Sequence, residues 1–286
     1  MGEVAKRLHR KLASKSHHLP ITAPKRRPGD PLPGGAKDIP TLIKEGCVPL
    51  HAVYAFIQQM SSQFAEGVAH WPEMKAWAQV VERAEDEYMP AGPPMSPLTG
   101  SYFWMWALYD LRIGTSNDTL SSCQIAANDI IQLDENQLNV LKALDRSRMG
   151  IYEHLGRDGS NIRLVELITE KQFLCHCTSG YVGNKGELWY VRVVPPLDPE
   201  LGEFWVTMTT PYVLVNVSKS DWIAFLKRTM LHSDASTDQA RLHRLLKYGP
   251  DTHYWNEFVF KAYCNHRQNA VFLTGIPDMA ATLPHA

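Results

Sequence analysis

The chain has 286 residues, of which 44% are hydrophobic and 21% charged, a composition typical of soluble globular proteins with a sizeable core. It holds no apolar run of about 18 residues, so no spanning helix is expected, and its charged N-terminus lacks the apolar segment of a signal peptide. We therefore expect a cytoplasmic protein without a membrane partner, whose five cysteines, an odd number, stay reduced.

The net charge of −1 hides an uneven distribution along the chain. Residues 1–39 hold nine Lys and Arg against three Asp and Glu, whereas residues 40–217 hold twelve against twenty-one. A basic tail on an acidic body is attracted to nucleic acid or to acidic protein surfaces. A solubilising tail, or one that folds back on its own acidic body, explains the same charges.

Residues 1–39 are predicted to be a disordered basic tail. Their charges are scattered, Pro and Gly cluster after them, and apolar residues are too few for a core. If the tail binds nucleic acid or an acidic partner, its cations are the contacts: Lys6, Arg7, Arg10, Lys11, Lys25, Arg26 and Arg27.

Residues 40–149 are predicted to be a helical region. Apolar residues recur at helical spacing from residue 50 to 64 and again after Pro72, which suits the first turn of a helix. The aromatic run at 101–114 fits a buried helix or a buried strand equally well. Asp134 and Gln137 have the spacing of a capping box for a helix that continues through Leu144.

Residues 150–217 are predicted to form an antiparallel β module, because short runs of β-branched and aromatic residues alternate with turn residues. Residues 218–286 are predicted to be helical, with a capping box at Ser218 and Asp221, and to pack on the same core. The predicted fold is α+β: a helical N-terminal part, a small antiparallel β-barrel-like module and C-terminal helices. A module this short needs the helices for stability, so we expect one continuous core.

A zinc site is the first chemistry to test, because Cys175 and Cys177 flank a histidine and Cys264 stands two residues before His266. Structural zinc takes four Cys or His ligands, usually in two short-spaced pairs. The first pair shares one face of a predicted strand, whereas the second ends a predicted helix, where such residues diverge by about 200°. The pattern favours core packing for the first two thiols and no cofactor; zinc held by all four is the alternative.

The C-terminal helices carry a second group of cations. Leu242, Leu245 and Leu246 form an apolar stripe, and Arg241 and Arg244 lie off it. An arginine face binds phosphates, RNA or an acidic partner, although a solvated helix face explains it more simply. Phosphate-binding, dinucleotide-binding, nucleophile-elbow and zinc-protease motifs do not occur in the sequence, which removes the enzyme classes that are easily recognised.

Residues 101–217 resemble a group of uncharacterised bacterial proteins, some of which carry a SEC-C zinc tail. The segments that carry the resemblance are WMWALYDLRIG, LNVLKALDRSRMGIYEHL, IRLVELITEKQFLCHC and GELWYVRVVPP. The resemblance implies a small barrel after a helical domain and no activity. The SEC-C pattern itself is absent here, because CHC lies in the middle of the chain within a predicted strand.

These observations favour a non-catalytic protein-interaction role, such as an accessory subunit of a bacterial complex with a protein partner. The basic tail, the acidic body and the lack of a catalytic constellation support it. A nucleic-acid-associated protein that uses the basic tail is one alternative. A metal-dependent enzyme of unknown class is the other.

Overall fold

The structure is a computed structural model that describes residues 2–15, 37–69, 71, 74–89, 100–195, 197 and 204–285. The chain divides into two compact units, one of residues 1–81 and 107–146 and the other of residues 82–106 and 147–286. The sequence predicts one continuous core instead. Two of its crossings fall inside helices, where no loop or change of composition marks them, whereas the third, between residues 146 and 147, lies close to the predicted start of the β module.

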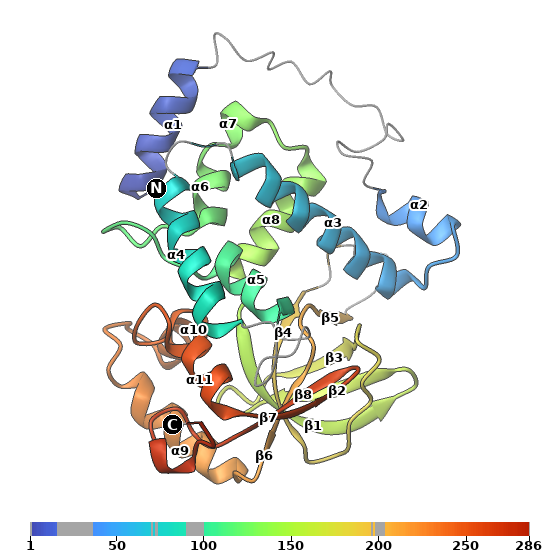
Figure 1. The fold of residues 1–286 in the computed structure, drawn as a ribbon. Helices are drawn as coiled ribbons and strands as arrows, with labels where there is room; N and C mark the ends of the chain where they lie inside the picture. Colours follow the sequence, from blue (N-terminus) through green and yellow to red (C-terminus); the bar gives the residue numbers. More distant parts are fainter. Residues whose placement is uncertain are drawn as a thin grey trace. The chain divides into compact units, whose positions relative to one another are not determined.

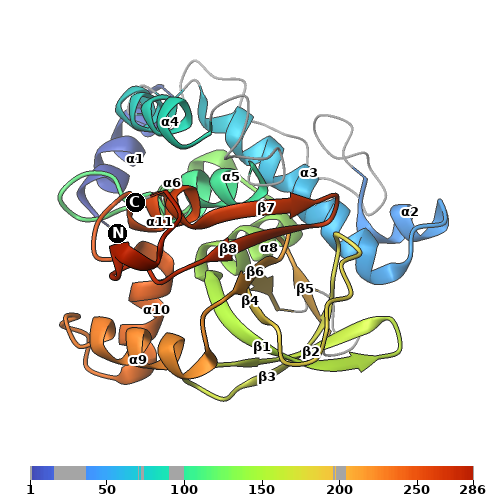
Figure 2. The ribbon, with the colours of Figure 1, turned by 60° about the horizontal axis from the view of Figure 1, so that its bottom comes forward.

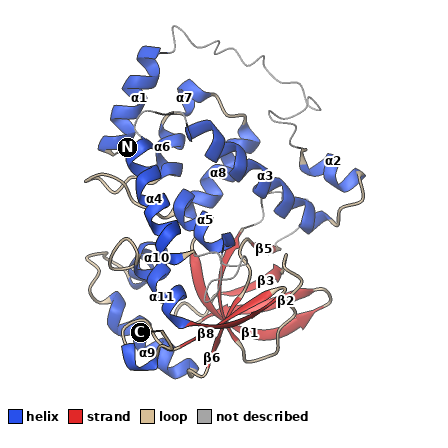
Figure 3. Ribbon diagram, viewed as in Figure 1, coloured by secondary structure: helices blue, strands red, loops and turns tan. Residues whose placement is uncertain are grey.

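Helices build the first unit, as Figures 1 and 3 show. The helices that lie wholly or partly in it are α1 (Glu3–Lys15), α2 (Ile39–Lys44), α3 (Pro49–Ala69), α4 (Met74–Tyr88), α5 (Gly100–Tyr109), α6 (Leu120–Ala126), α7 (Asn128–Ile131) and α8 (Glu135–Arg146). The unit boundary crosses α4 and α5. The aromatic run that fitted a helix or a strand forms α5. None of the described helices is both long enough and apolar enough to cross a bilayer.

The predicted capping box at Asp134 and Gln137 is present. At the start of α8, the backbone N–H of Gln137 donates to Asp134 Oδ1 at 2.9 Å, and the N–H of Asp134 donates to Gln137 Oε1 at 3.1 Å. The two bonds satisfy backbone donors that a helix start leaves without partners. In the second unit, Ser218 caps the next helix by accepting from the N–H of Asp221 at 3.2 Å.

The N-terminus differs from the prediction, because Glu3–Lys15 form helix α1 rather than a disordered segment. Val4, Leu8 and Leu12 recur every four residues and are buried in a core that α1 shares with Cys123 and Ala127. An apolar stripe of this spacing stabilises a helix once a partner covers it. The rest of the predicted tail lies outside the described residues up to Lys37.

An eight-stranded sheet forms the core of the second unit (Figure 3). Its strands are β1 (Met149–Asp158), β2 (Asn161–Glu166), β3 (Gln172–His176), β4 (Leu188–Val194), β5 (Trp205–Thr207), β6 (Tyr212–Val215), β7 (Tyr263–Arg267) and β8 (Ala270–Thr274). β1 pairs with β4 as well as with β2, so the first five strands close into a barrel. The predicted α+β fold with a barrel-like module is confirmed.

The barrel has the closed strand order β1-β2-β3-β5-β4-β1. β3 is parallel to β5 and the other pairs within the barrel are antiparallel. This is the strand order of the OB-fold, a five-stranded Greek-key barrel. The pairing of β1 with β2 shifts between His154 and Gly156, and Gly156 has a φ of +123°. Such a bulge curves the strand as closure requires.

The C-terminal region also differs from the prediction, because it adds strands as well as helices. Helices α9 (Lys219–Met230), α10 (Asp238–Tyr248) and α11 (Tyr254–Ala262) precede the hairpin of β7 and β8, which is red in Figure 2. β8 pairs in parallel with β6, so the helices form the crossover between the two strands. The short apolar run Ala270–Thr274 does not by itself indicate a strand. Its pairing with β6 shows that it is one. A short 3₁₀ helix, Ala280–Thr282, follows.

Candidate functional site

The outer face of β2 and β3 is the solvent-facing side of the barrel. Along these strands Ile162 and Phe173 are buried, whereas Arg163 and Gln172 are exposed. Every residue of β4 is buried instead, because helices cover its outer side chains, as Trp255 stacks on Tyr190. A ligand of the barrel therefore has access at β2 and β3.

β3 and β5 separate near the start of β3, and a pocket lies where they part. Their described pairing is limited to Cys175 with Trp205 and His176 with Val206. A cavity of about 640 Å³ opens beside the first residues of β3. We call it the seam pocket, and the residues that line it include Arg163, Lys171, Gln172, Phe173, Phe204 and Trp205.

Two aromatic rings form a corner in the seam pocket. The ring centroids of Phe173 and Trp205 lie 4.8 Å apart with their planes at 89°. Phe173 is buried and belongs to the barrel core, whereas Trp205 is half-buried. The Nζ atom of Lys171 lies 5.2 Å from the first centroid and 5.0 Å from the second, within the range of cation–π attraction. The corner thus combines a half-buried ring that lines the pocket with a positive charge.

Arg163 adds a second cation to the seam pocket. Its guanidinium lies 2.6 Å from Asp158 Oδ2, and both side chains are about half exposed. An ion pair this exposed contributes little energy, so the guanidinium can exchange its partner for a ligand anion at small cost. The pocket therefore offers two cations, an amide and aromatic faces, a set that fits a planar ring linked to an anionic group.

Sequence reasoning missed the seam pocket. None of the residues that line it was singled out as a candidate from the sequence. The one local signal is the spacing of Lys171 and Phe173, two residues apart at the start of a predicted strand. Trp205 comes to the same place only through the parallel pairing of β3 with β5. No periodicity in the sequence predicts that pairing.

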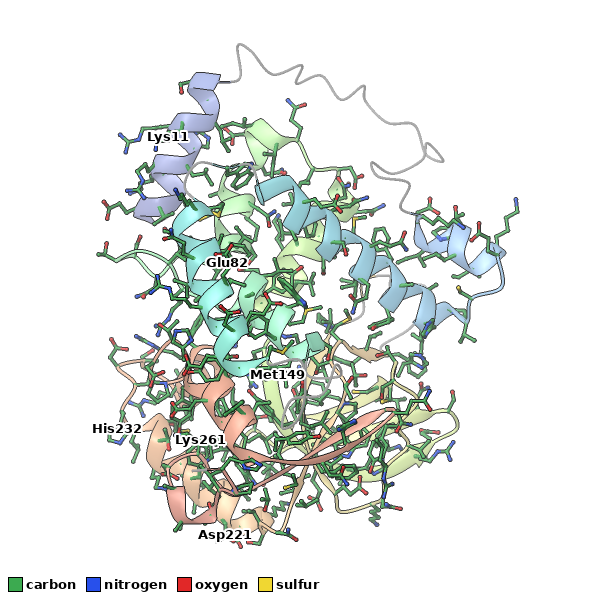
Figure 4. All side chains as sticks on the ribbon, in the orientation of Figure 1. Lys11, Glu82, Met149, Asp221, His232 and Lys261 are labelled. Atoms are coloured by element: carbon green, nitrogen blue, oxygen red, sulfur yellow. The ribbon has the colours of Figure 1, made fainter. Side chains whose placement is uncertain are left out.

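The cations predicted in the N-terminal tail are partly described. Lys6, Arg7, Arg10 and Lys11 all lie exposed on α1, and Figure 4 shows Lys11 on that helix. The structure therefore brings these four together on one helix. The remaining tail candidates, Lys25, Arg26 and Arg27, lie outside the described residues.

The arginines of α10 lie beside acidic residues. Arg241 Nη1 is 3.1 Å from Asp238 Oδ1, and its Nε donates to the carbonyl oxygen of Ala235 at 2.8 Å. Arg244 forms an ion pair with Asp234. Neighbouring carboxylates reduce the attraction of this face for phosphate. These contacts favour the simpler interpretation of a solvated helix face.

The four zinc candidates occupy two different environments. Cys175 and Cys177 are buried in the barrel core, whereas Cys264 and His266 are exposed on β7, a strand where the sequence predicts a helix end. Burial raises the pKa of both core thiols, which favours the protonated form over the thiolate that binds metal. The described residues contain no group of three or more His, Cys, Asp or Glu side chains placed to hold a metal ion.

We predict that alkylation separates the thiols by burial. At pH 8, iodoacetamide should modify Cys264 in the folded protein and leave Cys175, Cys177 and Cys123 unmodified until denaturant is added. Burial raises the pKa of Cys123 to about 12, so almost no thiolate is present at pH 8. Mass spectrometry of the digested protein measures each site. Rapid modification of Cys175 under native conditions would contradict the buried position.

A barrel of this strand order does not by itself indicate a function, because one fold is shared by many unrelated functions. Function must therefore follow from the seam pocket and from the exposed cations. Comparison of the chain with protein-family models, curated proteins and solved structures gives no match.

Proposed function

We propose that this chain is a non-catalytic protein that binds single-stranded nucleic acid in the seam pocket. The observation that supports this most is the aromatic corner of Phe173 and Trp205 beside Lys171 and Arg163. Single strands are held by bases stacked on aromatic rings and by cations that attract the phosphates. The seam pocket offers both kinds of contact in one cavity.

Lys171 has a specific role in this proposal. Its ammonium lies over both rings of the corner, where an incoming base stacks. The base replaces the ammonium on the half-buried ring of Trp205. The flexible stem of Lys171 then lets the charge turn towards a neighbouring phosphate. Base and phosphate are thereby held by adjacent groups.

The position of the seam pocket on the barrel also supports the proposal. OB-folds that bind oligonucleotides use the face of their second and third strands and the connections 1–2 and 4–5. The seam pocket includes Arg163 of β2 and the start of β3, and Phe204 ends the connection from β4 to β5. This likeness is an analogy of fold, and the side chains in the pocket carry the chemistry.

We thus prefer the nucleic-acid alternative to a protein-interaction role. In this proposal the barrel, and not the basic tail, makes the main contacts with the single strand. The corner of Phe173 and Trp205 supplies rings on which a base can stack, whereas exposed charges alone fit many partners. A role as a protein-interaction subunit in a bacterial complex stays a prediction, as does a cytoplasmic location.

Titration of a labelled single-stranded oligonucleotide, followed by fluorescence anisotropy, tests the proposal. Trp205→Ala should raise the Kd by roughly 5- to 150-fold, because stacking on one ring contributes about 1–3 kcal/mol. Trp205→Phe keeps a ring and should retain most of the affinity. Lys171→Gln should weaken the salt dependence of binding, since one phosphate contact is lost.

Two matched variants control for general effects. Trp104, on α5, has 46% of its surface exposed, and Trp104→Ala should leave the Kd unchanged. Lys185 is an exposed cation that does not line the seam pocket, and Lys185→Gln should leave the salt dependence unchanged. Equal losses for Trp104→Ala and Trp205→Ala would argue against the proposal, as would a wild-type protein that does not bind single strands.

A further inference from the structure

We propose a second site: α1 presents a preorganised cationic face that binds the phosphate backbone of duplex nucleic acid, and Asp118 is the positioning residue for this face. The site lies in the first unit and shares no residue with the seam pocket. It goes beyond single-strand binding and stands whether or not the barrel binds a single strand.

The four cations of α1 follow a helical pattern. Lys6, Arg7, Arg10 and Lys11 stand at positions i, i+1, i+4 and i+5, which group on one side of a helix. All four are exposed. A group of cations at this density attracts a regular array of phosphates and releases the counterions that the phosphates hold. The closely spaced cations of α1 match the regular phosphates of nucleic acid better than they match the scattered carboxylates of an acidic protein surface.

The opposite side of α1 is fixed to the first unit. Val4, Leu8 and Leu12 are buried there, packed in the core that includes Cys123 and Ala127 of the α6 region. The cationic side therefore faces away from that core. A helix held in this way keeps its cations in place before a ligand arrives, so less ordering entropy is lost on binding.

A buried carboxylate holds the first turn of α1. Asp118 Oδ2 accepts the backbone N–H groups of Val4 at 3.0 Å and Ala5 at 3.2 Å, and the hydroxyl of Ser116 at 3.1 Å. Asp118 is 7% exposed. A carboxylate in this place satisfies donors that the helix start cannot satisfy itself and interacts favourably with the helix dipole.

Other contacts around the first turn fix the same geometry. The N–H of Glu3 donates to Ser116 Oγ at 2.6 Å, and the hydroxyl of Thr115 donates to Glu3 Oε2 at 3.0 Å. A Cβ atom at Gly2 would collide with the Asp118 carboxylate. Only glycine therefore lets the backbone come this close to the carboxylate. The loop that contains Asp118 and the first turn of α1 thus form one structure.

Asp118 gives the proposal an unusual test, because charge and preorganisation predict opposite signs. Asp118→Ala removes a negative charge beside the cations, and electrostatics alone predicts tighter binding to phosphate. Loss of the carboxylate also frees the first turn of α1. The helix must then be ordered when the duplex binds, and the entropy lost in this step weakens binding. We expect the second effect to dominate, with a Kd about tenfold higher than in the wild type.

Asp129→Ala is the matched control. Asp129 also faces α1, where its Oδ2 lies 2.8 Å from Nε2 of His9, but it does not cap the helix. This variant makes the same change of charge and leaves the first turn in place. Its Kd should equal that of the wild type or be lower. Asp118→Asn keeps an oxygen that accepts N–H groups and should bind nearly as well as the wild type.

The experiment measures the full-length protein with a short labelled DNA duplex at several salt concentrations. A closed duplex offers no unstacked base to the seam pocket, so the result is independent of single-strand binding. Replacement of Lys6, Arg7, Arg10 and Lys11 together by Gln should reduce the slope of log Kd against log salt by up to about 0.9 for each lost contact. These exposed replacements leave the apolar stripe of α1 intact, and circular dichroism checks that each variant is folded.

Three results would overturn the inference. A wild-type protein that does not bind the duplex removes the site, even if single strands bind. An unchanged salt slope in the fourfold variant places the phosphate contacts elsewhere. Asp118→Ala that binds as tightly as Asp129→Ala removes the positioning role. Conversely, Trp205→Ala should leave the duplex affinity unchanged, so failure of the barrel proposal is recognised separately.

Discussion

Replacing Glu166 with Ala is expected to lower the free energy of unfolding by about 3–5 kcal/mol, because it leaves a buried cation without its partner. Arg148 Nη2 lies 2.7 Å from Glu166 Oε1, and the two side chains are 13% and 6% exposed. The second carboxylate oxygen accepts the hydroxyl of Thr169 at 2.6 Å. Urea denaturation of the variant and the wild type measures the difference.

Two comparisons identify the cause of this loss. Asp158 and Arg163 form an ion pair at 2.6 Å that is about half exposed, and Asp158→Ala should cost less than about 1 kcal/mol. The double variant Arg148→Met, Glu166→Leu removes both charges and should be much more stable than Glu166→Ala. A loss as small for Glu166→Ala as for Asp158→Ala would show that the pair is not buried in solution.

The second large effect concerns Trp189, and Trp189→Ala is expected to destabilise the protein by about 3–5 kcal/mol. Its side chain is fully buried in the barrel core. Its ring lies 5.1 Å from the His154 ring and 5.5 Å from the Tyr181 ring. Its Nε1 donates to Glu187 Oε2 at 3.1 Å. The substitution thus creates a cavity and removes one of the donors that hold the β3–β4 connection.

The control for Trp189 is a tryptophan in contact with solvent. Trp104→Ala should change the unfolding free energy by less than about 1 kcal/mol, because removing a side chain that is in contact with solvent leaves no closed cavity. Trp189→Phe should fall between the two, since it keeps a ring but loses the bond to Glu187. Similar unfolding midpoints for Trp189→Ala and Trp104→Ala would contradict the closed barrel core.

Local signals in the sequence predicted much of the fold. The spacing of Asp134 and Gln137 located the start of α8, and alternating apolar runs located the strands of the barrel. The helix α1 was missed although Val4, Leu8 and Leu12 carry a helical spacing, because dense charges hid a short apolar stripe. β8 was missed because a short apolar run does not distinguish helix from strand, and β7 because its residues are mostly polar and exposed. β8 pairs with β6 and β7 pairs with β8, and these pairings identify both segments as strands.

The candidate sites depend on partners that are distant in the chain. The four cations of α1 were recognised from the sequence, but their helix was not, and Asp118 lies more than a hundred residues away. The seam pocket was not recognised, because Phe173 and Trp205 meet through one short parallel pairing. Residue type identified the cations of α1 as candidates, whereas only the fold shows that Lys171 lies beside two aromatic rings.

Photo-crosslinking tests the binding of single strands by the barrel most directly. A single-stranded oligonucleotide containing 5-bromodeoxyuridine is bound to the full-length protein, irradiated and mapped by mass spectrometry. Adducts should lie in the peptides that contain Lys171–Leu174 and Phe204–Trp205, where the rings and cations of the seam pocket are placed. Efficient binding with adducts confined to other peptides, such as that of α1, would contradict the barrel site.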